Sequence, residues 1–190
     1  ERHARPVAPR GRYVLYLMQQ AQRASCNHAL EYAIRQANAL GRPVAAVFGL
    51  TPDYPGAGVR HYTFLMEGLR DTQRLLARRG IRLLIRPEPP DRAALGLARE
   101  AALLVLDRGY TRIQREWRDA VARAAPCRVV EIESDAIVPV ETAMAREAWM
   151  AATLRPRIQR RLADFLTPLT ETAPATPSRG MKFAGPDLDV

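Results

Sequence analysis

Three short stretches of the 190-residue sequence follow directly on apolar runs and hold side chains that can bind a small ligand. They span 18–23, 50–54 and 107–110, and they supply amides, carboxylates, arginines and tyrosines. Such groups can hydrogen-bond a polar ring edge or pair with an anion. The candidate binding residues are Met18, Gln19, Gln20, Arg23, Leu50, Asp53, Tyr54, Asp107, Arg108 and Tyr110.

The first stretch has the position of a phosphate-binding turn but lacks its glycines. A phosphate-cradling loop usually needs glycine so that backbone N–H groups can close on the anion. Here residues 19–23 read Gln-Gln-Ala-Gln-Arg. The sequence also lacks G-x-G-x-x-G, G-x-x-x-x-G-K-[ST], H-x-G-H, S-G-G-x-D-S and G-x-S-x-G, which argues against the nucleotide-binding and serine-nucleophile classes that use them.

Metal and disulfide chemistry are also disfavoured. His3, His28 and His61 form no metal-ligand pattern, and we expect them to be surface or helix-packing residues. Cys26 and Cys127 are far apart and belong to no C-x-x-C motif. Two such cysteines favour a reducing cytoplasm over a disulfide scaffold or a zinc site.

The elements that must position these residues alternate between strands and helices. Apolar runs predict strands at 13–18, 43–50, 81–85, 102–106 and 128–132. Amphipathic stretches between them predict helices at 27–40, 59–79, 90–100 and 111–124. This alternation predicts a Rossmann-like, doubly wound α/β fold, whose mostly parallel five-stranded sheet has helices on both faces. Ligands of such sheets bind at the carboxyl ends of the strands, where the three stretches lie.

The chain divides into four parts by composition. Residues 1–12 predict an exposed basic arm, and residues 13–133 the α/β domain. Residues 134–166 predict a connecting segment, extended at 135–140 and helical at 143–152 and 155–166. Residues 167–190 are rich in proline, threonine and alanine, which predicts a linker rather than a core element. No apolar run reaches the roughly 20 residues of a membrane span, so we expect no membrane partner.

The net charge of +9 comes almost entirely from arginine, and Lys182 is the only lysine. Abundant arginine and alanine are typical of a GC-rich genome, whereas arginine also neutralises nucleic-acid phosphates. The arginines are spread over several expected helices, which leaves both interpretations open. The densest run fits DNA contact, an interdomain contact or a solvated helix face, and it consists of Arg155, Arg157, Arg160 and Arg161.

Four stretches, taken in order, resemble the amino-terminal domain of class II cyclobutane pyrimidine dimer DNA photolyases. They are YVLYLMQQAQR with NHALEYA, PVAAVFGL with RHYTFLMEGL, LVLDRGYTRIQREWRDAVA, and VPVETAMAREAWMAATLRPRI. The resemblance covers about residues 11 to 170. The family usually has tryptophan at position 17, an acid at 26 and lysines at 146 and 157, where this sequence has Leu17, Cys26, Arg146 and Arg157.

The resemblance implies an antenna domain, either cut from a photolyase or standing alone. In the family the strand-end cleft holds a light-harvesting deazaflavin, flavin mononucleotide (FMN) or reduced folate. A helical domain after the linker holds FAD, and the whole enzyme repairs pyrimidine dimers in DNA by light-driven electron transfer. We therefore expect DNA and the chain's own FAD-binding domain as partners, and no repair by these 190 residues alone. Two alternatives are a stand-alone flavin- or nucleotide-binding module and a non-catalytic interaction domain.

The resemblance gives each strand-end residue a candidate role beside a structural one. Asp107 would accept a ring N–H of a deazaflavin or cap a turn, and as a strand-end acid it is expected to lie outside the core. Gln19 and Gln20 would bond a ring carbonyl or ribityl chain, or lie in a solvated turn. Arg23 would steer an anionic ligand, but we favour its bracing the turn against Asp107 or another domain.

The aromatic residues have similar pairs of interpretations. Leu50, Asp53 and Tyr54 would line the cleft, and Tyr110 would either stack on a ligand or pack at a helix entry. Trp117 lies on the apolar side of its expected helix and is predicted to pack in the core. Trp149 is predicted to pack against a core or a further domain. Neither tryptophan is assigned to electron transfer.

Overall fold

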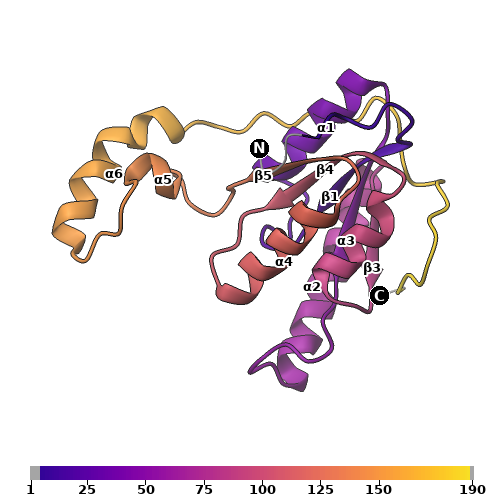
Figure 1. Ribbon diagram of the computed structural model, residues 1–190, viewed down its shortest axis with the longest axis horizontal. Coiled ribbons are helices and arrows are strands. Elements are labelled where there is room, and N and C mark those ends of the chain that lie inside the picture. The colour runs from indigo at the N-terminus through magenta and orange to yellow at the C-terminus, as the bar shows by residue number, and fades with distance from the viewer. Residues whose placement is uncertain (1–4, 189–190) are drawn as a thin grey trace.

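The computed structural model describes residues 5–188, and in it five parallel strands form one sheet in the order β3-β2-β1-β4-β5 (Figure 1). The strands are β1 Tyr13–Leu17, β2 Val44–Gly49, β3 Arg82–Arg86, β4 Ala101–Asp107 and β5 Arg128–Ile132. The helices between them are α1 His28–Leu40, α2 Val59–Arg78, α3 Pro90–Ala98 and α4 Arg112–Ala124. The predicted doubly wound α/β fold is confirmed, with boundaries that differ by one or two residues.

Alternate residues of the strands build two apolar cores, one on each face of the sheet. On one face Val14 and Tyr16 of β1 pack with the stripe of α1 that includes Leu30 and Ile34. On the other face Leu15 packs against α3 and α4. All five residues of β1 are buried, as expected of a central strand covered on both sides.

Most of the described residues of the arm predicted at 1–12 are exposed, but their backbone is hydrogen-bonded to the sheet. The Ala8 N–H donates to the Ala102 carbonyl at 2.9 Å, and the Arg12 N–H donates to the Glu100 carbonyl at 2.7 Å. Gly11 is buried so close to β4 that a Cβ there would lie 2.2 Å from the Ala102 Cα. Composition alone did not reveal this close approach, and residues 1–4 lie outside the described residues.

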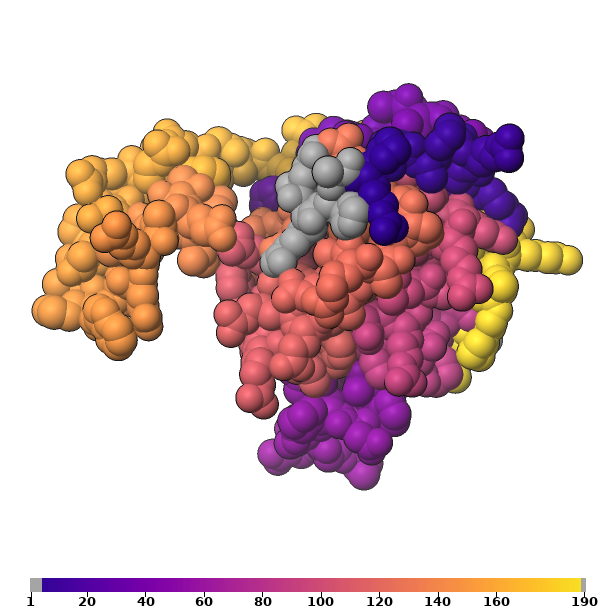
Figure 2. Space-filling model, viewed as in Figure 1, coloured from indigo at the N-terminus to yellow at the C-terminus, as the bar shows by residue number. Residues whose placement is uncertain are grey.

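The connecting segment forms an arm that projects from the α/β domain (Figures 1 and 2). It contains the short helix α5, Val140–Ala143, and the longer helix α6, Ala151–Phe165. The helix predicted at 143–152 is wrong, because residues 144–150 are not helical. No residue of α6 is buried, and Trp149 before it is 86% exposed, so within this arm Trp149 has no core to pack against.

The segment after α6 forms no helix or strand up to residue 188, yet it is not the separate linker that its composition predicted. Ser178 is fully buried, and its hydroxyl donates to the Val44 carbonyl at 2.6 Å while accepting from the Arg82 N–H at 2.9 Å. Its own N–H donates to the Gly80 carbonyl at 2.8 Å.

Further along, the same segment covers β3, the edge strand of the sheet (Figure 1). Asp187 accepts from the Ile85 N–H at 2.8 Å, and the Leu188 N–H donates to the Ile85 carbonyl at 2.8 Å. The Phe183 ring packs edge-on against Tyr13, with ring centroids 5.1 Å apart. The segment thus pairs an edge whose backbone groups would otherwise be open to solvent.

No helix within residues 5–188 is long and apolar enough to cross a membrane.

Candidate functional site

A cavity of about 420 Å³ lies at the carboxyl ends of β1 and β2, under the start of α2 and beside α4. Ligands of doubly wound sheets bind at the carboxyl ends of the strands, near the reversal of the strand order, which here lies between β1 and β4. The volume lies within the range of small-molecule sites. The lining residues are Gln19, Gln20, Gln22, Phe48, Gly49, Leu50, Thr51, Tyr54, Pro55, Gly56, Ala57, His61, Tyr62, Leu65, Gln114 and Trp117.

Aromatic and apolar side chains form much of the cavity wall. The rings of Tyr54 and Trp117 face each other across 6.3 Å between centroids, tilted by 51°. Tyr62 fixes the loop that carries Tyr54, because its hydroxyl lies 2.7 Å from both the Thr51 and Pro52 carbonyl oxygens and accepts from the Tyr54 N–H at 3.0 Å. These rings suit a flat aromatic ligand.

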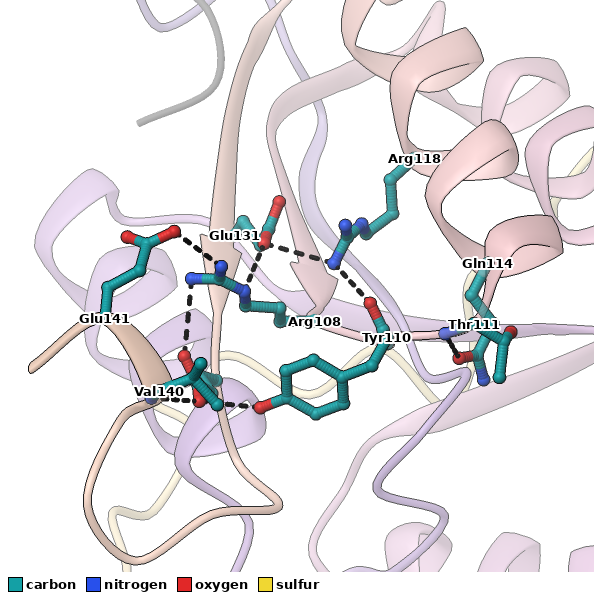
Figure 3. Close-up of polar contacts among 10 residues, drawn as sticks. Arg108, Tyr110, Thr111, Gln114, Arg118, Glu131, Val140 and Glu141 are labelled. Carbon is teal, nitrogen blue, oxygen red and sulfur yellow. Dashed lines mark hydrogen bonds and ion pairs between the residues drawn. The ribbon is translucent and has the colours of Figure 1, made fainter. Parts of the chain in front are cut away.

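Glutamine amides supply the polar groups of the wall. Gln114 on α4 donates from Nε2 to Gln20 Oε1 at 2.6 Å. Figure 3 shows its other contact, in which its own Oε1 accepts from the Thr111 N–H at 3.1 Å. Gln19 Oε1 is buried and has no hydrogen-bond partner. Buried acceptors are normally satisfied, so this oxygen is the group of the wall best placed to accept from a ligand.

Among residues 5–188, no Asp, Glu, Lys or Arg side chain lines the cavity. Within the described part of the chain, His61 is the only basic residue of the wall, and its Nδ1 accepts from the Gly58 N–H at 3.0 Å at the start of α2. A phosphate or carboxylate in the cavity would therefore find no arginine or lysine to pair with. The site suits an electrically neutral ligand.

Asp107 lies beneath this wall rather than on it. Its Oδ2 accepts from three successive backbone N–H groups, those of Gln19, Gln20 and Ala21, at 3.0, 2.8 and 2.9 Å. Its Oδ1 accepts from the Tyr16 hydroxyl at 2.8 Å. The side chain is 4% exposed, so the expectation that Asp107 lies outside the core is wrong.

Burial is the main cause of the pKa shifts of Asp107 and Tyr16. Burial raises the pKa of Asp107, and the backbone N–H donors and the Tyr16 hydroxyl oppose part of that rise. Burial, followed by the charge of Asp107, raises the pKa of Tyr16 well above its usual value. Asn27 completes the network, since its side-chain amide donates to the Tyr16 hydroxyl at 3.0 Å and to the Ala21 carbonyl at 2.8 Å.

Arg108 and Tyr110 lie outside the cavity, in a cluster of carboxylates (Figure 3). The Arg108 guanidinium lies 2.6 Å from Glu141, 3.3 Å from Glu133 and 3.4 Å from Glu131. The hydrogen bond to Glu141, assisted by the other carboxylates, raises the pKa of Arg108. Tyr110 donates to Glu133 at 2.6 Å, and burial followed by this bond raises the pKa of Tyr110. Since Glu141 is part of α5, the cluster ties the arm to the sheet.

Some of the residues predicted at the site line the cavity, and others do not. Gln19, Gln20, Leu50 and Tyr54 line the cavity, whereas Asp53 does not and Met18 is fully buried in the core. Arg23 braces the turn as favoured, but against other partners than Asp107. Its Nε donates to the Cys26 carbonyl at 3.0 Å, and it reaches the Ser134 carbonyl at 3.4 Å.

The residues that sequence reasoning missed lie mostly on helices. Tyr62 on α2 and Gln114 on α4 line the cavity, and so does Trp117, which was predicted to pack in the core. Gln114 and Trp117 are three residues apart and so share a helix face, a signal that was available in the sequence. Among residues 5–188, no group of three or more histidine, cysteine or acidic side chains could hold a metal ion.

Comparison with known proteins gives a consistent family. The family model described as DNA photolyase matches residues 14–177. The chain is 49% identical over 160 residues to the deoxyribodipyrimidine photo-lyase of Methanothermobacter thermautotrophicus, which covers 84% of this chain and 36% of that protein. It is 32% identical over 185 residues to the deoxyribodipyrimidine photo-lyase of Oryza sativa, which covers 93% and 37%.

A solved structure shares the fold. The class III photolyase of Agrobacterium tumefaciens superposes with a TM-score of 0.62 at 19% identity, over 88% of this chain and 33% of that one. At this identity the likeness concerns the fold alone. The chain spans about a third of the length of these relatives.

Proposed function

The chain belongs to the DNA photolyase family, and from this premise we propose that its strand-end cavity binds a light-harvesting antenna chromophore. The observation that carries the proposal is the buried, unpaired Gln19 Oε1 in a cavity walled by Tyr54 and Trp117. The aromatic wall stacks on a flat ring, and the oxygen accepts from a ring N–H. When bound, the chromophore absorbs light and passes the excitation energy to a flavin.

Among the three chromophores of the family, we propose a deazaflavin without a phosphate. FMN carries a phosphate, and a reduced folate carries glutamate carboxylates. Burying such an anion without a cation is strongly unfavourable, and the wall of this cavity contains no arginine or lysine. A deazaflavin with only a ribityl chain asks for hydrogen bonds, which Gln19, Gln20 and Gln114 are placed to provide.

The ring N–H expected to pair with Asp107 is assigned to Gln19 instead. Both oxygens of Asp107 accept from protein donors, so the carboxylate already has its hydrogen bonds. Gln19 Oε1 has none, and the residue that carries it lines the cavity. Asp107 then supports the site by holding the turn that carries Gln19 and Gln20.

For the whole protein we propose light-driven repair of pyrimidine dimers in DNA, by electron transfer from FAD in a helical domain that follows residue 190. The support is the family and the share of its relatives that this chain spans, about a third. We also propose class II, supported by the four sequence stretches in their order. The 190 residues alone are expected to bind the antenna and to repair nothing. Light-dependent repair by the isolated chain would overturn that expectation.

The proposal is tested by titrating the purified chain with three ligands and following their fluorescence or absorbance. A phosphate-free 5-deazaflavin is expected to bind, and FMN and a reduced folate to bind far more weakly. Ala57→Trp, which fills the cavity, should abolish binding, whereas Ala39→Trp on the exposed side of α1 should not. Preferred binding of FMN would refute the neutral-ligand argument, and no binding of any chromophore would favour a non-catalytic interaction domain.

A further inference from the structure

Three successive N–H groups of the first turn point at a single oxygen. Those of Gln19, Gln20 and Ala21 lie 3.0, 2.8 and 2.9 Å from Asp107 Oδ2. Successive backbone N–H groups that converge in this way form a nest, an arrangement that binds anions such as phosphate. In nucleotide-binding α/β proteins a phosphate occupies the turn after the first strand. Here the anion in the nest belongs to the chain itself.

Contacts that do not involve Asp107 hold the shape of the nest. Asn27 donates from Nδ2 to the Ala21 carbonyl at 2.8 Å and to the Arg23 carbonyl at 3.1 Å. Gln22 donates from Nε2 to the Gln19 carbonyl at 3.0 Å. Asn27 is itself fully buried and caps α1 by accepting from the Leu30 N–H at 2.9 Å. The backbone of the turn is therefore positioned from the helix side as well as by the carboxylate.

The nest adjoins the chromophore cavity. Gln19, Gln20, Gln114 and Trp117 line the cavity, and the same four side chains line the narrow space that reaches Asp107. An anion bound at the nest in place of the carboxylate would therefore lie next to the floor of the cavity. A ligand that carried a phosphate could occupy both places at once.

We propose that Asp107 is a specificity-determining residue, which fills the anion nest and so excludes phosphate-bearing ligands from the strand-end site. Its side-chain oxygen satisfies the three N–H donors and occupies the place where a phosphate would have to bind. The inference rests on the proposed function for the ligand that is selected, but the nest and its occupant do not depend on it. Shortening Asp107 should convert the turn into a phosphate site.

The test uses inorganic phosphate as the probe and four forms of the chain. Asp107→Ala empties the nest and frees its donors. Asp107→Asn leaves the space filled, and Tyr16→Phe removes the other hydrogen bond of the carboxylate while leaving the nest occupied. The melting temperature, Tm, of each form is measured against phosphate at constant ionic strength, with chloride as the compensating salt.

Phosphate is expected to raise the Tm of Asp107→Ala by about 3–6 °C at tenfold excess over the dissociation constant, and the rise should continue with the logarithm of the phosphate concentration. The wild type, Asp107→Asn and Tyr16→Phe should show only the smaller, shared rise in Tm that phosphate gives to folded proteins in general. Asp107→Ala should also bind FMN more tightly than the wild type does, which shows that a ligand phosphate and not only the free ion is excluded. A folded Asp107→Ala with no response to phosphate beyond that shared rise would overturn the proposal.

The stability loss expected for Asp107→Ala does not weaken the test. Should it unfold in chloride, recovery of its circular dichroism signal in phosphate supports the proposal. Failure to fold in either salt overturns it, because the nest would then depend on the carboxylate. Chromophore binding by the wild type is measured with another ligand, so failure of one proposal is distinguishable from failure of the other.

Discussion

Replacing Gln19 by methionine should stabilise the ligand-free protein and weaken chromophore binding. Gln19 Oε1 is buried without a partner, and an unsatisfied buried acceptor destabilises a fold by about 1–3 kcal/mol. Methionine has nearly the same length and lacks that oxygen. The backbone bonds of this residue, to Asp107 and from Gln22, remain. The free energy of unfolding of Gln19→Met should therefore rise by about 1–3 kcal/mol.

The same substitution acts in the opposite direction on the complex. The net contribution of one hydrogen bond is about 0.5–1.5 kcal/mol. Its loss should raise the dissociation constant of the deazaflavin by about 2- to 13-fold. Higher stability combined with lower affinity is the signature of an oxygen kept unpaired for a ligand. If Gln19 had a purely structural role, its substitution would instead lower the free energy of unfolding of the protein.

The two quantities are measured by urea unfolding of the ligand-free chain and by fluorescence titration with a phosphate-free 5-deazaflavin. Gln159→Met is the matched control, because Gln159 is exposed on α6 and far from the cavity lining. It should change neither quantity. A Gln19→Met protein that is less stable than the wild type would refute the reasoning on stability, and an unchanged affinity would remove Gln19 from contact with the ligand.

Three further perturbations test other parts of the structure. Ser178→Ala removes a buried hydroxyl that both donates and accepts, and should lower the free energy of unfolding by about 2–4 kcal/mol in urea; a change near zero would mean that the final segment does not bind the sheet in solution. Burial raises the pKa of Tyr13 from 10 to about 12, so its stabilising contribution is complete below pH 10 and is lost as the pH rises towards 12. The advantage of the wild type over Tyr13→Phe should shrink by about 2 kcal/mol between pH 10 and pH 12, and parallel pH profiles would contradict this. Bound chromophore should quench the emission of Trp117, so that Trp149→Phe retains the quenching and Trp117→Phe loses it; the reverse pattern would place the ligand on the arm.

The sequence was sufficient for the fold because each strand and helix carries its own pattern. The run 13–18 is apolar throughout, and the stripe of α1 repeats at helical spacing, so local patterning and tertiary packing agree. It was insufficient for residues 167–188. Their composition is that of a linker, but a few side chains, Ser178 and Asp187 among them, satisfy backbone groups of β2 and β3. Composition describes the segment as a whole and does not reveal single contacts of this kind.

The candidate site could also be predicted only in part from the sequence. Residues in the loops that follow the strands, such as Gln19 and Tyr54, could be placed near a ligand because the carboxyl ends of parallel strands meet at one edge. Tyr62, Gln114 and Trp117 depend on how α2 and α4 lie over that edge. That arrangement follows from the tertiary packing, which no local pattern contains.

The glycine-free turn is explained by a residue 88 positions away in the sequence. The order of strands places β4 beside β1, with Leu106 paired to Leu17, so that Asp107 meets the turn directly after both strands end. A carboxylate on a fixed strand needs no glycine in the turn, because it supplies one oxygen to N–H groups that are already in position. The absence of glycine and the acid at the end of β4 are therefore two parts of one arrangement, and a domain that keeps both should select ligands without phosphate.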